Sequence, residues 1–286
     1  MSDKRLLLCT DLDRTLIPNG VESEHPDARK RFRAFCRCPG VTLVYVSGRH
    51  QALITEAIRN YTLPEPDYVI SDVGSKIYRI SEGAWQENLQ WAEAIDQDWK
   101  GVSRSQIQAM LAQVNELSLQ EGSKQNTHKL SYYLSLFTNK DKVLQKVNTI
   151  LDENGISANL IYSVDEPRHM GLLDLLPRSA NKLHAIKFLQ AQLGFQLDEV
   201  LFAGDSGNDL QVLTSEVHSI LVSNARSDIK HKATAISRAN GHADALYIAN
   251  AANLNMNGNY SAGILEGIWH FAPHFRTSIS QENPDK

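Results

Sequence analysis

The sequence has few of the features that mark membrane-bound, nucleic-acid-binding or secreted proteins. Every apolar run falls well short of the roughly 20 residues that a membrane-spanning helix needs. There is no block of basic residues and the net charge is only −4, so a nucleic-acid partner is not expected. Residues 1–5 lead directly into an apolar segment and not into a signal peptide. We therefore expect a cytoplasmic protein that binds neither membranes nor nucleic acid.

Cysteine is also scarce. The three cysteines, Cys9, Cys36 and Cys38, are an odd number and lack the spacing of a zinc-binding set. This fits a reducing compartment, and we interpret all three as structural. The chain contains no internal repeat or low-complexity tract, and we expect disorder only in its tail, residues 278–286.

The segment LLLCTDLDRTL, residues 6–16, predicts a buried strand that ends in charged side chains. Residues two apart on a strand share a face, so Asp11 and Asp13 can converge in front of the strand end. Unpaired carboxylates at the edge of an apolar core are unfavourable, so the pair indicates a cation or a reaction that uses both groups. On this segment alone, a simple turn that closes the strand is the alternative.

The order of apolar segments predicts an α/β protein whose core is a doubly wound, Rossmann-like parallel sheet. After the first strand, helices are expected at 25–38 and 50–60, and strands at 41–46 and 67–70. The pattern resumes later with a helix at 181–193, a strand at 199–203, a helix at 210–214 and a strand at 219–222.

Between these two parts, the chain predicts an inserted α+β cap domain. Its expected helices are 85–99, 103–120 and 140–153, and its expected strands are 129–137, 159–164 and 171–176. We therefore assign residues 1–83 and 178–286 to the core and residues 84–177 to the cap.

A second acidic cluster, GDSGND at residues 204–209, follows the buried strand at 199–203. In an open parallel sheet the ligand lies beyond the carboxyl ends of the strands. The side chains expected to reach one crevice there are Asp11, Asp13, Ser47, Asp205 and Asp209. Carboxylates so close together repel one another unless a divalent cation lies between them, and an all-oxygen set favours Mg²⁺. Lys182, near the start of a predicted helix, adds a positive charge suited to a phosphate.

Four motifs carry a resemblance to a known family: DLDRT at 11–15, the serine of VSGR at Ser47, the lysine of RSANK at Lys182, and GDSGND at 204–209. In this order they resemble the motifs of the haloacid dehalogenase-type phosphatases. The insert resembles the cap of a branch in which sugar phosphatases predominate. PEPDYVISDVGSKIY at 64–78, KLSYYL at 129–134, LLDLLPRSANK at 172–182 and YSAGILEGIWHF at 260–271 are similar to sucrose-phosphate phosphatases. Mannosylfructose-phosphate and related disaccharide-phosphate phosphatases look alike in these segments.

The resemblance implies a catalytic role for four residues. Asp11 is the nucleophile that forms an aspartyl-phosphate, and Asp13 is the acid that protonates the leaving sugar oxygen and then the base that activates water. Ser47 and Lys182 hold the oxygens of the transferred phosphoryl group.

The resemblance also implies a Mg²⁺ site. Its ligands are Asp11, the carbonyl of Asp13 and Asp205, with Asp209 either a direct ligand or one step removed from the metal. Arg14 stands where many members have a small residue, and Ser47 replaces the commoner threonine, but neither departure removes a required group.

Substrate recognition is expected from the cap, which closes over the crevice, together with core residues below it. The candidate substrate-binding residues are Thr15, Gly48, Arg49, Gln51, Lys129, Ser131, Tyr132 and Asn208. For Tyr132, packing within the cap sheet is an equal alternative.

The expected function is Mg²⁺-dependent hydrolysis of a sugar phosphate, with sucrose 6-phosphate favoured as the substrate. Mannosylfructose phosphate and trehalose 6-phosphate are alternative substrates. A sugar phosphomutase and a non-catalytic sugar-binding partner of a synthase are alternative functions, although the intact acidic motifs and Lys182 argue against the second. We expect a monomer, with contact to a sugar-phosphate synthase as a further expectation.

Overall fold

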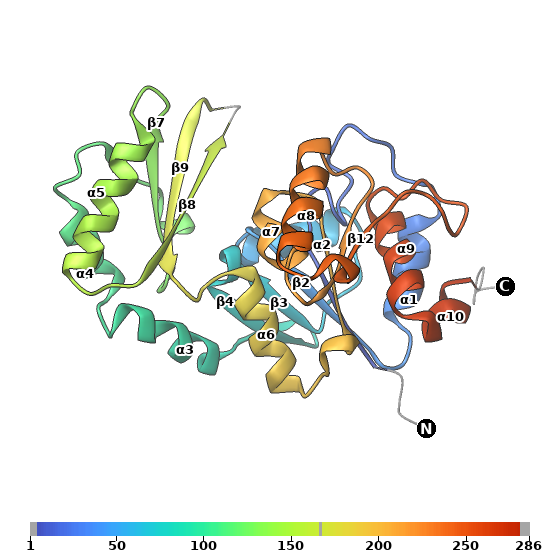
Figure 1. The fold of residues 1–286 in the computed structure, drawn as a ribbon. Coiled ribbons are helices and arrows are strands. Elements are labelled where there is room, and N and C mark those ends of the chain that lie inside the picture. Colours follow the sequence, from blue (N-terminus) through green and yellow to red (C-terminus); the bar gives the residue numbers. More distant parts are fainter. Residues whose placement is uncertain (1–4, 166–167, 281–286) are drawn as a thin grey trace.

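The computed structural model describes the chain except for residues 1–4, 166–167 and 281–286. An eight-stranded sheet forms the core and a separate four-stranded sheet lies beside it in the cap (Figure 1). The predicted α/β class, with a Rossmann-like core, is confirmed. No helix in the described residues is both long enough and apolar enough to cross a membrane.

The core sheet has the order β12-β11-β10-β1-β2-β3-β4-β5. All pairs from β12 to β3 are parallel, and β4 and β5 are added in antiparallel orientation. The strands are β1 (Leu6–Thr10), β2 (Val41–Val46), β3 (Tyr68–Ser71), β4 (Lys76–Ser81), β5 (Ala84–Glu87), β10 (Val200–Gly204), β11 (His218–Leu221) and β12 (Leu246–Ile248). The helices are α1 (Ala28–Cys36), α2 (Gln51–Asn60), α6 (Lys182–Leu193), α7 (Leu210–Leu213), α8 (Ser227–Ala239), α9 (Ser261–Phe271) and α10 (Arg276–Ser280).

Both faces of the core sheet are covered because β1 is apolar on both sides. Leu6 and Leu8 pack into a cluster with residues of α1, α2 and α9. Leu7 and Cys9 point the other way, into a cluster with residues of α6, α7 and α8. A continuous apolar strand is typical of a parallel sheet buried on both faces. This burial holds the carboxyl end of β1 in a fixed place.

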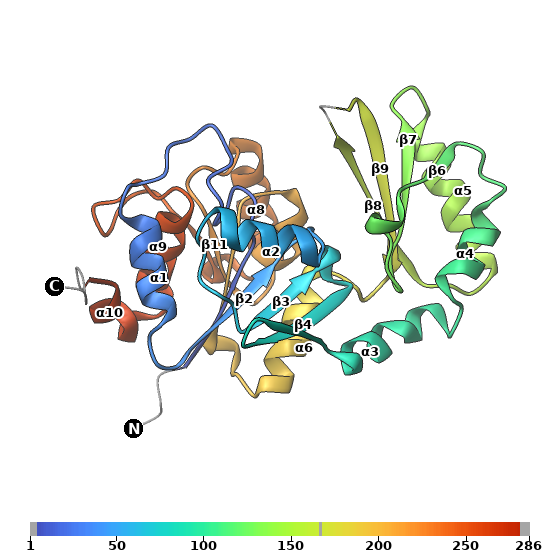
Figure 2. The same cartoon turned by 180° about the vertical axis from the view of Figure 1, so that it is seen from behind.

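The cap is an antiparallel sheet with helices on one side only. Its elements are α3 (Leu89–Trp99), α4 (Arg104–Leu111), β6 (Leu117–Leu119), β7 (Leu130–Ser135), α5 (Lys140–Glu153), β8 (Ala158–Asp165) and β9 (Met170–Pro177). The strand order is β6-β7-β9-β8. Figures 1 and 2 show α4 and α5 on the side away from the core, so that the open face of the sheet is turned toward the core.

The boundary between core and cap lies later than residue 84. A helix was expected over residues 85–99, but Ala84–Glu87 form β5, which pairs with β4 in the core sheet. Glu82 (φ 51°) and Gly83 (φ 76°) both adopt positive φ between these strands, as in a two-residue type I′ hairpin turn. Helix α3 then begins after Asn88, whose side chain accepts a hydrogen bond from the backbone N–H of Trp91.

Helix α3 belongs to both parts of the molecule. Trp91 and Ile95 are buried in the core's apolar cluster, whereas Trp99 is buried in that of the cap. The return segment is tied to the same helix, since Ser179 donates from its backbone N–H to Asp98 Oδ2 at 2.7 Å. The cap therefore joins the core through two connections that are bonded to each other.

Two further expectations are corrected. The helix predicted over 103–120 ends at Leu111, and Leu117–Leu119 form the edge strand β6. The predicted disordered tail begins too early, because residues 276–280 form α10, and the remainder of that segment lies outside the described residues.

A tight turn after β3 places α6 against the core. In the turn η1 (Asp72–Gly74), Gly74 has φ +101°, and a Cβ added there would lie 2.5 Å from the backbone carbon of Asn181. Asn181 caps α6, because its side chain accepts a hydrogen bond from the backbone N–H of His184. Only glycine therefore allows this close approach between the turn and the start of α6.

We expect Gly74→Ala to lower the free energy of unfolding by about 2 kcal/mol or more, because alanine is strained at this φ and collides with Asn181. Urea unfolding followed by circular dichroism measures the change. Gly122→Ala is the matched control, because a Cβ there has no heavy atom within 4 Å. Equal stability of the two variants would contradict this account.

Candidate active site

The acidic residues predicted at the strand ends come together. Asp11 directly follows β1, Asp205 directly follows β10, and Asp209 ends the turn η4 (Gly207–Asp209). One carboxylate oxygen from each lies within 4.8 Å of the others, and all three residues are buried. The sequence predicted this convergence from the shared carboxyl edge of a parallel sheet.

A glycine lets the second acidic motif fold back on itself. A Cβ on Gly204 would lie 2.7 Å from the carboxylate carbon of Asp209. Asp209 Oδ2 instead accepts hydrogen bonds from the backbone N–H groups of Asp205 and Ser206, each at 3.1 Å. These bonds fix the orientation of the Asp209 side chain, whose other oxygen faces Lys182.

Lys182 connects the two acidic motifs. Its Nζ lies 2.9 Å from Asp11 Oδ1 and 2.7 Å from Asp209 Oδ1, and the lysine is only 2% exposed. Burial by itself would lower the pKa of Lys182, but the charges of Asp11 and Asp209 outweigh it and raise the pKa. The ammonium group is therefore charged and balances one of the three carboxylates.

The remaining negative charge is unfavourable without a further cation. Burial raises the pKa of Asp11 although Lys182 opposes the shift. Burial and then the charge of Asp209 raise the pKa of Asp205 from its ordinary value of 3.8 to about 6. Since three buried carboxylates face a single buried lysine, the donor set suits a hard divalent cation.

Asp13 points away from this cluster toward Arg49. Arg49 donates from Nε at 2.7 Å and from Nη2 at 2.5 Å, and Asn19 adds a third hydrogen bond at 2.7 Å. Burial alone would raise the pKa of Asp13, but the hydrogen bonds and charge of Arg49 outweigh it and lower the pKa. Asp13 is therefore an anion held by a two-point ion pair.

A cavity of about 300 Å³ opens beside these groups. Its lining includes Asp11, Asp13, Asp205, and three of the predicted substrate-binding residues, Gly48, Arg49 and Asn208. Ser47, one residue before Gly48, is almost fully buried, and its Oγ accepts a hydrogen bond from the backbone N–H of Arg49 at 3.2 Å.

Two predicted substrate contacts in the core are corrected. Thr15 is fully buried, and its Oγ1 donates to Asp205 Oδ1 at 3.3 Å, so it holds a carboxylate and does not face a substrate. Gln51 is exposed on the first turn of α2 and lines a separate surface hollow with residues of the same helix.

In the cap, β7 places Ser131 and Tyr132 on opposite faces. Ser131 Oγ donates to Asp174 on the neighbouring strand β9. Tyr132 lies in the apolar cluster that α4 and α5 cover, on the side away from the core. The structure therefore favours the packing alternative for Tyr132 over a contact with the sugar.

Lys129 reaches from the cap to the core. Its Nζ lies 3.8 Å from Asp72 of the η1 turn and 3.6 Å from Asp174 of the cap. Nearby, Asn126 donates from Nδ2 to Ser75 Oγ at 3.0 Å. This part of the cap therefore contacts the core directly at the end of β3.

Sequence reasoning missed two residues at this edge of the sheet. Asp72 is buried and adopts φ 50°, and its place after the buried strand β3 matched the signal that identified Asp11 and Asp205. Arg14 places its Nε 3.4 Å from Asp205 Oδ2 and also contacts Glu22. No sequence signal pairs Arg14 with Asp205.

A carboxylate that attacks phosphorus needs a cation to offset charge, and a second carboxylate must handle the proton of the leaving oxygen. In this structure Asp11 contacts the buried Lys182 and lines one cavity with Asp13, on a doubly wound core toward which the cap turns the open face of its sheet. The fold and the site thus define a haloacid dehalogenase-type hydrolase of phosphoric monoesters, as the motifs predicted.

Comparison with known proteins narrows the class of phosphoric monoester hydrolase to which the chain belongs. The model of the sucrose-6F-phosphate phosphohydrolase family matches residues 4–272, and the chain belongs to this family. A HAD-like hydrolase of Nitrosococcus oceani is 45% identical over 96% of this chain and 73% of its own. Mannosylfructose-phosphate phosphatase of Agrobacterium fabrum is 27% identical over 93% of this chain and 96% of its own.

The sucrose phosphatases are as similar in sequence to this chain as the Agrobacterium protein is. Sucrose-phosphatase 1 of Nicotiana tabacum is 27% identical over 94% of this chain, which spans only 60% of the tobacco protein. A solved structure of the sucrose-phosphatase of Synechocystis, in complex with sucrose and phosphate, has a TM-score of 0.71 and 27% identity. It covers 94% of this chain and 98% of its own.

In metal-free buffer, we expect Asp205→Asn to be more stable than the wild type by about 1–3 kcal/mol at a pH near 8. The pKa of Asp205 is raised to about 6 in the folded protein, so its ionisation there destabilises the fold above that pH. The difference should shrink as the pH falls through 6 and vanish below the ordinary value of 3.8. Urea titrations at several pH values, with a chelator present, measure it.

If the difference in free energy of unfolding between the wild type and Asp205→Asn stays constant over this pH range, the effect does not arise from titration of Asp205. Asp228→Asn is the control, because this exposed carboxylate has a lowered pKa, through Arg226, and lies on α8 outside the acidic cluster.

Proposed function

We propose that this protein hydrolyses sucrose 6-phosphate to sucrose and phosphate, using Mg²⁺ and an aspartyl-phosphate intermediate. The observation that carries the proposal is the 2.9 Å contact between Lys182 and the buried Asp11, which lines a cavity together with Asp13. Membership of the sucrose-6F-phosphate phosphohydrolase family supports the substrate. So does the similarity to a structure that holds sucrose and phosphate.

In the first half of the reaction, an Asp11 carboxylate oxygen attacks phosphorus and the bond between phosphorus and the sugar oxygen breaks. The sugar oxygen takes a proton from Asp13 as it leaves. In the second half, Asp13 takes a proton from water, whose oxygen attacks the aspartyl-phosphate and releases Asp11 and phosphate. Lys182 remains charged throughout and offsets the negative charge that develops beside Asp11.

Arg49 governs when Asp13 can carry a proton. The two hydrogen bonds from Arg49 lower the pKa of Asp13, which disfavours the protonated acid that the first half requires. Both residues line the cavity beside Asp11, so an arriving phosphate competes with Asp13 for the guanidinium. Substrate binding thus frees Asp13 for proton transfer.

The acidic cluster fits Mg²⁺. Its donors are hard carboxylate oxygens, their spacing is short, and burial together with the charge of Asp209 raises the pKa of Asp205. Asp11, Asp205 and Asp209 would hold the ion, together with the backbone carbonyl of Asp13. When bound, Mg²⁺ neutralises charge on the phosphate oxygens and orients the phosphoryl group.

Residues of the cap would recognise the sugar part of the substrate. Lys129 and Ser131 lie on or next to β7, and Ser131 lies on the face turned toward the core. Lys129 Nζ is within 4 Å of both Asp72 and Asp174, which gives one ammonium and two carboxylates for binding sugar hydroxyls. Such contacts are remote from phosphorus and can select one sugar without changing the chemistry.

Asp11→Asn keeps the shape of the site and removes the nucleophilic charge, so we expect release of phosphate from sucrose 6-phosphate to fall at least about a hundredfold. Circular dichroism checks that the fold is retained. Turnover above about a tenth of the wild-type rate would rule out the covalent route. The identity of the substrate is tested by assaying the wild type with mannosylfructose phosphate in parallel. A higher kcat/KM for mannosylfructose phosphate than for sucrose 6-phosphate would make it the preferred substrate.

Millimolar Mg²⁺ should raise the melting temperature of the wild type, because the ion binds only the folded cluster. At 100 times the dissociation constant the stabilisation is about 2.7 kcal/mol. Asp205→Asn should lose most of this shift, whereas the control Asp228→Asn should keep it. An undiminished shift in Asp205→Asn would place the ion elsewhere.

Lys129→Met should lower the ratio of kcat/KM for sucrose 6-phosphate to kcat/KM for p-nitrophenyl phosphate by about tenfold, since hydrogen bonds to charged groups contribute about 1.5–3 kcal/mol. Tyr132→Phe is the control, because the hydroxyl of Tyr132 is buried in the cap without a hydrogen-bond partner among the described residues. An unchanged ratio of the two kcat/KM values in Lys129→Met, or an equal decrease of this ratio in both variants, would show that Lys129 does not bind the sugar.

A further inference from the structure

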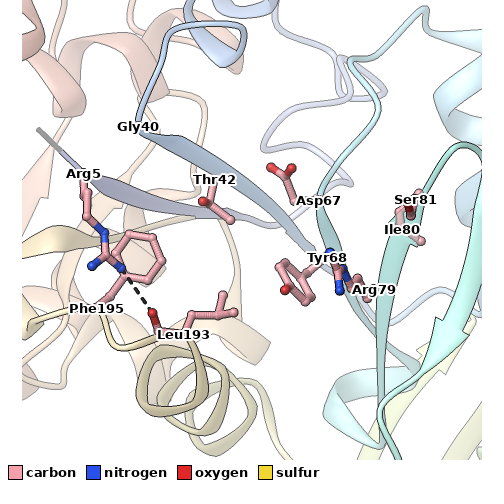
Figure 3. A pocket seen from close by; sticks show the side chains of 10 residues that line it. All are labelled: Arg5, Gly40, Thr42, Asp67, Tyr68, Arg79, Ile80, Ser81, Leu193 and Phe195. Carbon is pink, nitrogen blue, oxygen red and sulfur yellow. Dashed lines mark hydrogen bonds between the residues drawn. The ribbon is translucent and has the colours of Figure 1, made fainter. Parts of the chain in front are cut away.

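A further hollow, distinct from the active-site cavity and from the hollow at Gln51, lies at the opposite edge of the core sheet from the active site. It has a volume of about 530 Å³ and is shown in Figure 3. Arg5 precedes β1, Gly40 precedes β2 and Asp67 precedes β3, so the hollow gathers the amino ends of the strands. The active-site residues follow the carboxyl ends of the strands. The length of the five-residue strand β1, about 16–17 Å, separates the two sites.

One wall of the hollow presents a fixed guanidinium group. Arg5 donates to the carbonyl oxygens of Leu193 at 3.2 Å and Gly194 at 3.5 Å, at the end of α6. Its guanidinium carbon also lies 4.1 Å from the centre of the Phe195 ring. Figure 3 shows Arg5 stacked on this ring at one side of the hollow. These contacts hold the charge in place and leave part of the group available to a ligand.

The opposite wall presents a second guanidinium. Arg79 lies on β4, directly opposite Tyr68 of β3 in the strand pairing, and Figure 3 shows the two side chains together. Arg79 is exposed, and no carboxylate of the described residues forms an ion pair with it. Two arginines on facing walls make an anion the expected ligand, because guanidinium groups bind phosphate or carboxylate oxygens at two points.

The other residues that line the hollow indicate a ligand that carries hydroxyl groups in addition to an anionic group. Thr42, Tyr68 and Ser81 contribute hydroxyl groups. Asp67 contributes a carboxylate, of which Oδ2 accepts from the backbone N–H of Leu43 at 2.8 Å. A carboxylate repels an isolated phosphate but accepts hydrogen bonds from hydroxyl groups. A ligand that joins a phosphate to a polyol satisfies the arginines, the hydroxyls and Asp67 together.

We propose that this hollow is a binding site for a small phosphorylated sugar, separate from the catalytic site. The volume suits such a ligand, since small-molecule sites range over about 300–1,000 Å³. The site does not rely on the acidic cluster or on the cap. Its existence is therefore independent of the reaction proposed above.

Calorimetric titration with glucose 6-phosphate tests the proposal, using Asp11→Asn as the parent protein so that no turnover occurs. We expect the parent to bind two equivalents. The double variant Asp11→Asn, Arg79→Gln should lose one equivalent, or bind it at least tenfold more weakly. Arg79 is exposed and has no ion pair in the described part of the chain, so the fold should be retained, which the melting temperature checks.

Asp11→Asn, Arg238→Gln is the matched control, because it removes the same charge from an exposed position on α8. It should bind like the parent. Identical isotherms for the Arg79 variant and the parent would overturn the site, as would an equal loss in the Arg238 variant. Inorganic phosphate should bind the hollow at least tenfold more weakly than glucose 6-phosphate, and equal affinity would overturn the assignment of a sugar.

Discussion

The contact of one buried ammonium with two carboxylates is the constraint on which the active site depends. Lys182 holds Asp11 from the first strand and Asp209 from the turn after β10, with distances of 2.9 and 2.7 Å. Because all three groups are buried, removing Lys182 would leave two buried carboxylates with no compensating charge. The close approach of Gly74 to Asn181 matters for the same reason, since it fixes the helix that begins at Lys182.

The orientation of the cap follows from how its sheet is covered. Helices α4 and α5 bury one face, so the side chains of Leu130, Tyr132 and Leu134 belong to the cap's interior. The intervening residue Ser131 lies on the face turned toward the core. Two bonded connections, through α3 and through the segment at Ser179, carry this sheet over the edge where the strands end. The acidic cluster therefore lies in the core, and the open face of the cap sheet is turned toward the core.

Much of this arrangement was readable from local pattern. Apolar strands that end in carboxylates identified Asp11 and Asp205 because a parallel sheet sends every such end to the same edge. The same rule applies to Asp72, a buried carboxylate that directly follows strand β3. Short helices and strands were harder to predict from the sequence. Ala84–Glu87 are four residues, mostly exposed, at the edge of a sheet, so their pattern did not distinguish a strand from the start of a helix.

The sequence by itself determined the fold class, the inserted cap and the cluster of Asp11, Lys182, Asp205 and Asp209, because each depends on local periodicity or on a motif at a strand end. The tertiary structure alone decided which face of β7 the helices cover, since alternation places Ser131 and Tyr132 on opposite faces without saying which is buried. It also decided that Arg49 pairs with Asp13 and Arg14 with Asp205. Charged side chains have many potential partners along a chain, and only the folded backbone brings one of them within reach.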